Sequence, residues 1–370
     1  MLTNLYGGVQ SPYYIYAPRW IESSAGIRAL HFLCHSLNRS GQIAYLVMCE
    51  PTFNNLPRVS PNLLTPILTQ EVADSHYHAN LTPIVIYSET VPGNPLGATF
   101  IVRYLMNYVG ALDGPTTYEE NDYLLAFSQT IALDVKDRIR REVNSTLFLP
   151  PIDPRGFVVN TVKENYQVVY AGKYRSFIGK PSKVGALRSI EIFRDGPRMQ
   201  DKNKVKNLLS KASVLYTFEN SSIATEAILS GTPVCFVQTQ LTQKIIAEFE
   251  LGSFGVTLSD DADSIKKARS TIPDAIAVYF KSIETYFLEL EKLIASTQLI
   301  AGETGYSEII QVPTFNSYVT EHRIALAGQI FRKRGLGALI RVIYHFAMRR
   351  LSWRFWNKSR TKINSDIVDS

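Results

Sequence analysis

The stretch that decides the fold is Val214–Val237, which reads VLYTFENSSIATEAILSGTPVCFV. A short apolar run opens it, a polar turn follows, and a helical pattern continues over Ser221–Ser230. Gly231-Thr232-Pro233 then ends the helix, and Pro233–Val237 is a second apolar run of strand length. A strand, a helix and a strand in this order predict one α/β unit of a parallel sheet.

The start of this helix is rich in side chains that accept hydrogen bonds. Asn220, Ser221 and Ser222 are each suited to cap the helix, whose first backbone amides then point toward a ligand. Because the N-terminal end of a helix carries a partial positive charge, we expect a phosphate group there. Glu226, about one turn further on, is placed to accept hydrogen bonds from sugar hydroxyls.

Similar α/β units occupy most of the chain. Further apolar runs of strand length lie at 13–16, 42–49, 84–87, within 122–132, and at 146–149, 167–171 and 189–193. Helical patterns lie at 27–37, 98–107, 201–210 and 273–296. The segment Pro150–Pro154 interrupts the series, because proline breaks both helices and strands. We therefore predict two α/β domains, 1–150 and 151–330, with a cleft at the C-terminal ends of their strands.

Positive charge is concentrated at the C-terminal end. The sequence has 39 Lys or Arg and 33 Asp or Glu, but ten of the bases and only two of the acids follow residue 330. The near-neutral remainder argues against a nucleic-acid-binding surface. In 331–362 the bases alternate with aromatic and aliphatic residues, which predicts a basic amphipathic helical tail, 331–370, on an anionic membrane surface. The alternatives are a helix packed on the first domain and an arm for a partner.

Other patterns narrow the location and the chemistry. The sequence has no secretory signal and no apolar stretch of the roughly 20 residues that span a membrane, so we expect a cytoplasmic protein, peripheral on the inner face of the membrane. It lacks the glycine-rich dinucleotide motif, the phosphate-binding loop and the serine-hydrolase elbow. We interpret Asp261-Ala262-Asp263 as a helix cap, and Asp74, His76 and His78 as a polar loop, so no metal is expected.

The segment Glu226–Val234, EAILSGTPV, resembles the donor-domain motif of GT-B glycosyltransferases, especially the retaining family 4 enzymes. The resemblance implies two Rossmann-like domains, with Glu226 on the ribose of the donor and Ser221 and Ser222 on its phosphates. It also implies a catalytic glutamate that contacts the donor sugar. Glu219 is the candidate, although six residues separate it from Glu226 where the family has seven.

Two further segments carry the resemblance. In VVYAGKY, 168–174, Gly172 and Lys173 match a Gly-Lys pair that binds the diphosphate, and Arg194 matches a second basic position. In APRWIESSAGIR, 17–28, Gly26 and Arg28 match a turn near the diphosphate or the acceptor, with Ala25 in place of the usual first glycine. The block 87–110 resembles surface-polysaccharide glycosyltransferases and offers polar candidates for the acceptor site. These candidates are Glu89, Asn94 and Arg103.

The resemblance implies a metal-independent hexosyl- or deoxyhexosyltransferase that retains the anomeric configuration and needs no cofactor. Its donor is a nucleoside-diphosphate sugar. Its acceptor is a lipid-linked saccharide of bacterial surface polysaccharide synthesis, such as lipopolysaccharide O-antigen or capsule. A nucleotide-sugar epimerase of the same fold, and a non-catalytic protein that binds polysaccharide or a membrane assembly, are the alternatives.

Overall fold

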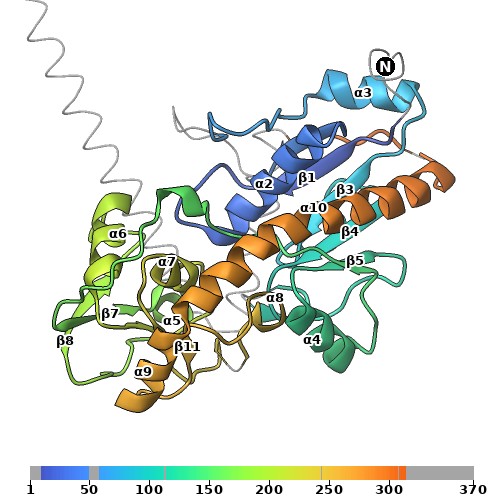
Figure 1. The fold of residues 1–370 in the computed structure, drawn as a ribbon. Coiled ribbons are helices and arrows are strands. Elements are labelled where there is room, and N and C mark those ends of the chain that lie inside the picture. Colours follow the sequence, from blue (N-terminus) through green and yellow to red (C-terminus); the bar gives the residue numbers. More distant parts are fainter. Residues whose placement is uncertain (1–9, 50–57, 112–113, 243, 307, 314–370) are drawn as a thin grey trace, which may run out of the picture. The chain divides into compact units, whose positions relative to one another are not determined.

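The computed structural model describes residues 10–49, 58–111, 114–242, 244–306 and 308–313. Two parallel β-sheets organise this part of the chain, and each is flanked by helices (Figure 1). We call the residues around the six-stranded sheet the first domain and those around the five-stranded sheet the second domain. The predicted pair of α/β domains is therefore confirmed, whereas the predicted tail, 331–370, lies outside the described residues.

The first domain contains six parallel strands in the spatial order β2-β1-β3-β4-β5-β6. The strands are β1 (Tyr13–Ala17), β2 (Ala44–Met48), β3 (Ile84–Ser88), β4 (Phe100–Leu105), β5 (Tyr123–Ala126) and β6 (Ser145–Thr146). The helices are α2 (Ala25–Arg39), α3 (Gln70–His78) and α4 (Gln129–Ile139). All residues of β1, β3, β4 and β5 are buried, because these apolar strands are covered on both faces.

The segment 98–107, predicted as a helix, contains the strand β4 instead, so that prediction is wrong. The six residues of β4, FIVRYL, are all buried and, apart from Arg103, apolar, and such a run does not distinguish a strand from a buried helix. The loop 89–99 joins β3 directly to its parallel neighbour β4. Asn94 holds this loop, because its Oδ1 accepts the Ala98 N–H at 2.9 Å and its Nδ2 donates to the Ala98 carbonyl at 2.8 Å.

The second domain contains five parallel strands in the spatial order β11-β10-β9-β7-β8. The strands are β7 (Tyr166–Tyr170), β8 (Arg188–Ile192), β9 (Leu215–Thr217), β10 (Val234–Phe236) and β11 (Val256–Thr257). The helices are α5 (Gly172–Phe177), α6 (Lys202–Lys211), α7 (Ile223–Leu229), α8 (Glu248–Leu251) and α9 (Ala262–Ser270). The predicted strand-helix-strand unit corresponds to β9, α7 and β10, and it forms part of the buried core of this sheet.

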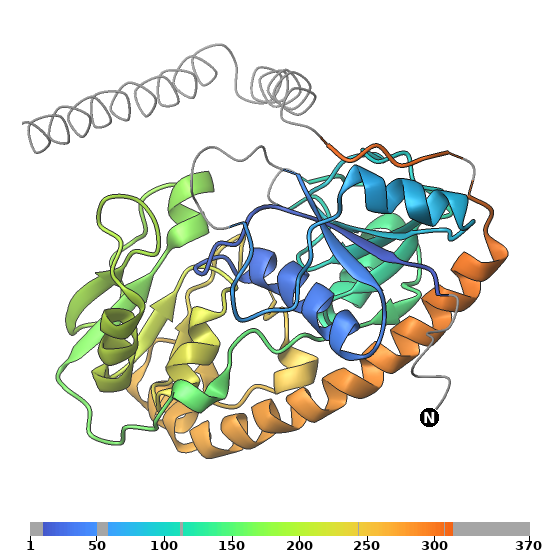
Figure 2. The ribbon, with the colours of Figure 1, turned by 90° about the horizontal axis from the view of Figure 1, so that it is seen from above.

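A long helix, α10 (Ile272–Glu303), packs against both domains (Figure 2). Near its start, the Tyr279 hydroxyl donates to the carbonyl of Ile152 at 2.6 Å and accepts the N–H of the same residue at 2.8 Å. From the middle of the helix onward, Tyr286, Leu290 and Leu293 join the core of the first sheet. The helix predicted at 273–296 is therefore confirmed, and its second half belongs to the core of the first domain.

Two segments considered as metal sites have other surroundings. Asp261 caps α9, because its Oδ1 accepts the N–H of Ser264 at 2.8 Å. Asp74, His76 and His78 lie in α3 rather than in a loop, so that prediction is wrong, and His76 Nδ1 is hydrogen-bonded to the Tyr14 hydroxyl at 2.7 Å. Within the described residues, no group of three His, Cys, Asp or Glu is placed to hold a metal ion. No described helix is long and apolar enough to cross a membrane.

Candidate functional site

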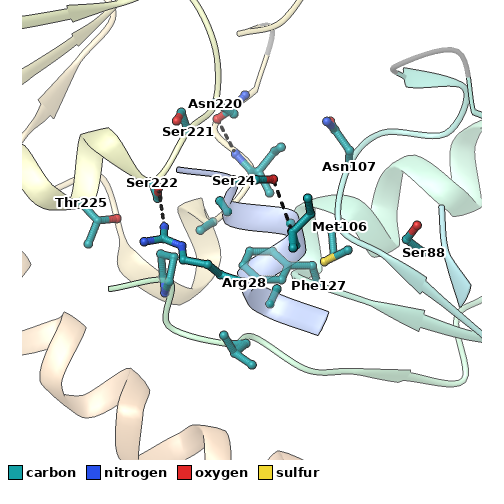
Figure 3. Close-up of a pocket in the computed structure, with 18 of the residues that line it drawn as sticks. Ser24, Arg28, Ser88, Met106, Asn107, Phe127, Asn220, Ser221, Ser222 and Thr225 are labelled. Carbon is teal, nitrogen blue, oxygen red and sulfur yellow. Dashed lines mark hydrogen bonds between the residues drawn. The ribbon is translucent and has the colours of Figure 1, made fainter. Parts of the chain in front are cut away.

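A cleft of about 320 Å³ lies between the two sheets and is lined by both domains (Figure 3). The first domain contributes the start of α2 and the residues that follow β3, β4 and β5. The second domain contributes Lys173, the segment Asn220–Ser222 and the segment Ile245–Ala247. Parallel strands present their C-terminal ends at one edge of a sheet, and ligands of open α/β sheets bind at that edge. The cleft therefore lies where the strand order predicts a ligand.

Arg28 lines the cleft from the first domain and reaches the second. It lies in the first turn of α2, and its Nη2 donates a 3.0 Å hydrogen bond to Oγ of Ser222 (Figure 3). The side chain is almost buried, at 8% exposure, and burial lowers the pKa of its guanidinium. Its Nε–H is buried and has no partner among the described residues. Arg28 thus keeps one unused donor at a site from which water is largely excluded.

The start of α2 opens toward the cleft. Ser24 caps the helix by accepting the N–H of Ile27 at 3.5 Å, and Ala25 and Gly26 line the cleft beside it. A Cβ added to Gly26 would meet its nearest described atom, Cε of Met106, at 3.9 Å, which is an ordinary contact. The protein packing alone therefore does not require glycine at this position.

The start of α7 differs from the prediction. Ser222 is the N-cap residue of α7, but among the described contacts its side chain makes no capping bond and accepts from Arg28 instead. Asn220 is turned the other way: its Nδ2 donates to the carbonyls of Leu241 and Lys244. The prediction that these side chains cap α7 is wrong, because contacts from distant parts of the chain use them.

Glu226, in the first turn of α7, forms an ion pair with Arg194. The Arg194 Nη2 and Glu226 Oε2 atoms are 2.5 Å apart, and both side chains are largely buried. Neither residue is among the described residues that line the cleft. Burial lowers the pKa of Arg28, and the negative charge of Glu226 partly offsets this effect. Arg28, Arg194 and Glu226 therefore form one cluster of interacting charges.

Lys173 and Glu219 meet at the start of α5. Lys173 lines the cleft, whereas Glu219 is 1% exposed, and its Oε2 accepts the N–H of Tyr174 at 2.9 Å. Burial raises the pKa of Glu219. A Cβ added to Gly172, the first residue of α5, would lie 2.7 Å from the Tyr170 hydroxyl oxygen, so the Tyr170 side chain would have to shift. The carboxyl of Glu219 thus stabilises the start of α5 from below the cleft surface.

Glu89 lines the cleft directly after β3. Its side chain is 6% exposed, and its Oε2 accepts the N–H of Met106 at 3.2 Å. Burial raises the pKa of this carboxyl, and the positive charge of Lys173 acts in the opposite direction. A buried carboxyl with a raised pKa in a cleft is a common feature of catalytic sites.

The other two acceptor candidates of this block stabilise the loop 89–99. Arg103 forms a buried ion pair with Asp122, with 2.7 Å between Nε and Oδ2, and its Nη1 donates to the carbonyl of Val91 at 3.1 Å. Asn94 closes the turn described above and accepts the hydroxyl of Tyr87 at 3.0 Å. Neither is among the described residues that line the cleft, and a role for them in acceptor binding stays a prediction.

Apolar residues form much of the cleft wall, and sequence reasoning missed them. Met106 and Phe127 follow β4 and β5, and Ile245 and Ile246 come from the second domain. One signal in the sequence could have identified Met106 and Phe127, which is that each comes immediately after a buried strand. Ile245 and Ile246 have none, because contacts with the start of α4 fix their position: the Ser128 hydroxyl donates to the carbonyl of Ile246.

Two further hydrogen bonds hold the same wall of the cleft in place. The backbone N–H of Gln129, the first residue of α4, donates to Oε1 of Glu250 at 2.7 Å. The Tyr108 hydroxyl donates to the carbonyl of Lys244, also at 2.7 Å. These bonds join the segment 244–250 of the second domain to the first domain.

No protein-family model matches the sequence, and no curated protein matches it. Among solved structures, the fold is similar to that of an O-GlcNAc transferase mutant of Thermobaculum terrenum, with a TM-score of 0.52, 12% identity, and coverage of 80% of this chain and 68% of that chain. WaaG, a glycosyltransferase involved in lipopolysaccharide biosynthesis, gives a TM-score of 0.42 at 13% identity, covering 76% of this chain and 98% of its own. The architecture of the described residues is thus the two-domain GT-B fold of glycosyltransferases.

Proposed function

We propose that the protein transfers a sugar from a nucleoside-diphosphate sugar to a saccharide acceptor. The observation that carries this proposal is the pair of cations in one cleft of a GT-B fold, Arg28 from the first domain and Lys173 from the second. Transfer of a sugar from such a donor leaves a diphosphate, whose developing charge is stabilised by fixed cations and helix-end amides. Arg28 is suited to this task because its Nε–H has no partner among the described residues.

The donor is proposed to lie along the second domain. Lys173 and Arg28 neutralise the diphosphate, with Gly172, Ser221 and Ser222 near its oxygens. Glu226 contacts the ribose, which requires its ion pair with Arg194 to be shared or opened when the donor binds. In the mechanism that the family resemblance implies, Lys173, Arg194 and Glu219 are the catalytic residues and the anomeric configuration is retained.

The acceptor is proposed to lie against the first domain, with Glu89 in contact with it and with Asn94 and Arg103 shaping the loop beside it. We propose a lipid-linked saccharide of bacterial surface polysaccharide synthesis as the acceptor and a hexose or deoxyhexose as the transferred sugar. The reaction proceeds without a metal or a cofactor. Residues 331–362 attach the enzyme to the cytoplasmic face of the membrane.

A thermal-shift screen of nucleoside diphosphates and their sugars tests the donor site. A ligand at 100 times its dissociation constant adds about 2.7 kcal/mol to the free energy of unfolding, so a true donor series is readily detected. We expect one nucleotide series to stabilise the wild type and to stabilise Glu226→Ala much less. Glu284→Ala, which changes an exposed glutamate on α10, is the matched control and keeps the wild-type response.

Two results would count against this function. If no nucleotide or nucleotide sugar stabilises the wild type, the catalytic proposal fails and the non-catalytic alternative gains support. If a nucleotide sugar binds and is converted to an isomer without transfer or hydrolysis, the protein is an epimerase. Both are read from the same samples, by melting temperature and by chromatography of the nucleotide sugars.

A further inference from the structure

Glu89 is the one acidic side chain among the described residues that line the cleft, and no histidine, cysteine or tyrosine lines it there. The remaining polar groups of the lining are hydroxyls, side-chain amides, backbone groups and the cations Arg28 and Lys173. None of these is an efficient proton acceptor near neutral pH. Among the described lining residues, Glu89 is therefore the one side chain suited to accept a proton from a substrate.

The carboxyl of Glu89 is fixed in position by a hydrogen bond, and its surroundings favour its action as a base. Its Oε2 is fixed by the Met106 N–H, and Glu89 takes part in no ion pair within the described part of the chain. Its side chain is mostly buried, so water solvates the carboxylate poorly. A carboxylate that is poorly solvated and not neutralised by a salt bridge is a stronger base than a free one.

We propose that Glu89 is the general base of sugar transfer, an inference that rests on the proposed function. The acceptor hydroxyl gives its proton to the Glu89 carboxylate while its oxygen forms a bond to the anomeric carbon of the donor. The bond from that carbon to the diphosphate oxygen breaks, and its electron pair leaves with the diphosphate. Lys173 and Arg28 stabilise the added charge on this leaving group.

This role has a stereochemical consequence. Direct attack of a base-activated oxygen on the anomeric carbon inverts its configuration, whereas retention needs a different arrangement at the donor sugar. The carboxyl that the family resemblance places at that sugar, Glu219, is not among the described lining residues and is bonded to the start of α5. The position of the two carboxyls therefore favours inversion over the retention that the resemblance implies.

Hydrolysis of the donor tests the proposal without a known acceptor, because water then takes the place of the acceptor hydroxyl. Wild type and Glu89→Gln are incubated with UDP-glucose, UDP-galactose, UDP-N-acetylglucosamine and dTDP-glucose, and the released sugar is followed by proton NMR before it mutarotates. From these α-linked donors we expect the β-sugar first. Glu89→Gln lowers kcat by roughly 10²- to 10⁴-fold with KM nearly unchanged, and the acid limb of the kcat profile disappears.

The Gln variant is expected to fold, since its side-chain oxygen still accepts the Met106 N–H. Glu289→Gln is the matched control. Burial also raises the pKa of Glu289, its Oε2 accepts the backbone N–H of Phe148, and it is not among the described lining residues. We expect this variant to keep the wild-type rate and pH profile.

Each other result overturns the inference in a recognisable way. Release of the α-sugar first by the wild type, or a Glu89→Gln variant with the wild-type kcat, removes Glu89 as the base and leaves the proposed function standing. If the wild type binds none of the four donors and no nucleotide sugar in the thermal-shift screen, the proposed function fails and the inference fails with it. If Glu89→Gln does not fold, the anomer released by the wild type still decides.

Discussion

The Nη2 atom of Arg28 lies 3.0 Å from Oγ of Ser222 and donates a hydrogen bond to it, across the cleft from α2 to the start of α7. The two residues are 194 positions apart in the sequence, and their contact joins the two domains directly. The same guanidinium has a buried Nε–H that no described residue accepts. Arg28 therefore combines a contact between the domains with a buried donor that no described residue uses.

Replacement of Arg28 by methionine is expected to weaken binding of nucleoside diphosphates. The variant keeps the apolar stem and loses the charge and its donors. Hydrogen bonds to charged groups contribute about 1.5–3 kcal/mol, which corresponds to a loss of affinity of at least about tenfold. Titration calorimetry with UDP and dTDP measures the change.

A comparison of Arg28→Met with Ser222→Ala separates the anion contact of Arg28 from its contact with Ser222. Ser222→Ala removes the acceptor and leaves the charge, so we expect a smaller loss of affinity and a loss of about 1 kcal/mol in the free energy of unfolding. Equal losses of affinity in the two single variants would contradict a direct role of the guanidinium in diphosphate binding.

Gly231 is expected to tolerate no side chain. Its φ of +79° is unfavourable for other residues, and an added Cβ would lie 2.9 Å from the carbonyl oxygen of Asn160. We expect Gly231→Ala to lower the free energy of unfolding by roughly 1–3 kcal/mol, measured by urea denaturation. Gly302, in α10, is the control: its added Cβ meets no described atom within 4 Å, so Gly302→Ala should raise stability by up to about 1 kcal/mol. Equal effects of the two substitutions would contradict this account.

The order of strands and helices could be predicted from the sequence because it depends on local patterns. The run 167–171 became β7, and the turn at Gly231-Thr232-Pro233 ends α7 and leads into β10, as its residue types indicate. Two exceptions are α3, whose residues were interpreted as a polar loop, and β4. The residues of β4 are buried and, apart from Arg103, apolar, so they carry no periodic signal, and a loop stands where a helix was expected between β3 and the next strand.

The contacts of the candidate site could be predicted only in part. Glu89, Arg28 and Lys173 were selected from motifs, and all three line the cleft. The hydrogen-bond and ion-pair partners of these polar groups could not be predicted, because such contacts join positions far apart in the sequence. The residues around Ser222 in the sequence do not indicate that its hydroxyl accepts a hydrogen bond from Arg28 instead of capping α7.

Arg103 is expected to matter for stability rather than directly for binding. It forms an ion pair with Asp122 in which both side chains are 3% exposed. Removal of one partner leaves a buried charge unpaired, so Arg103→Met should lower the free energy of unfolding by about 3–5 kcal/mol. Urea denaturation measures the loss, and calorimetry on the folded fraction should show unchanged nucleotide affinity.

Arg155→Met is the control for this ion pair. Arg155 pairs with Asp153 at 2.6 Å but is 87% exposed, so its loss should leave the free energy of unfolding almost unchanged. A small effect of Arg103→Met, similar to that of the control, would show that the loop 89–99 does not depend on the buried pair.

The titration of Glu219 is expected to make the free energy of unfolding depend on pH. Burial of its carboxyl sets the direction of this dependence. Burial raises the pKa of its carboxyl in the folded protein above that in the unfolded chain. Between these two pKa values the folded state binds more protons, so the free energy of unfolding rises as the pH falls through this window. Glu219→Gln lacks the titration, and its oxygen still accepts the N–H of Tyr174.

We therefore expect Glu219→Gln to be more stable than the wild type at pH 7, with a difference that shrinks toward pH 4.5. Urea denaturation of both proteins at several pH values measures it. Glu164→Gln, at an exposed ion pair with Lys211, measures the general effect of removing one negative charge and is subtracted. A difference that grows as the pH falls would mean that the start of α5 stabilises the carboxylate more than burial destabilises it. The pKa of Glu219 in the folded protein would then lie below its ordinary value, contrary to the effect expected from burial.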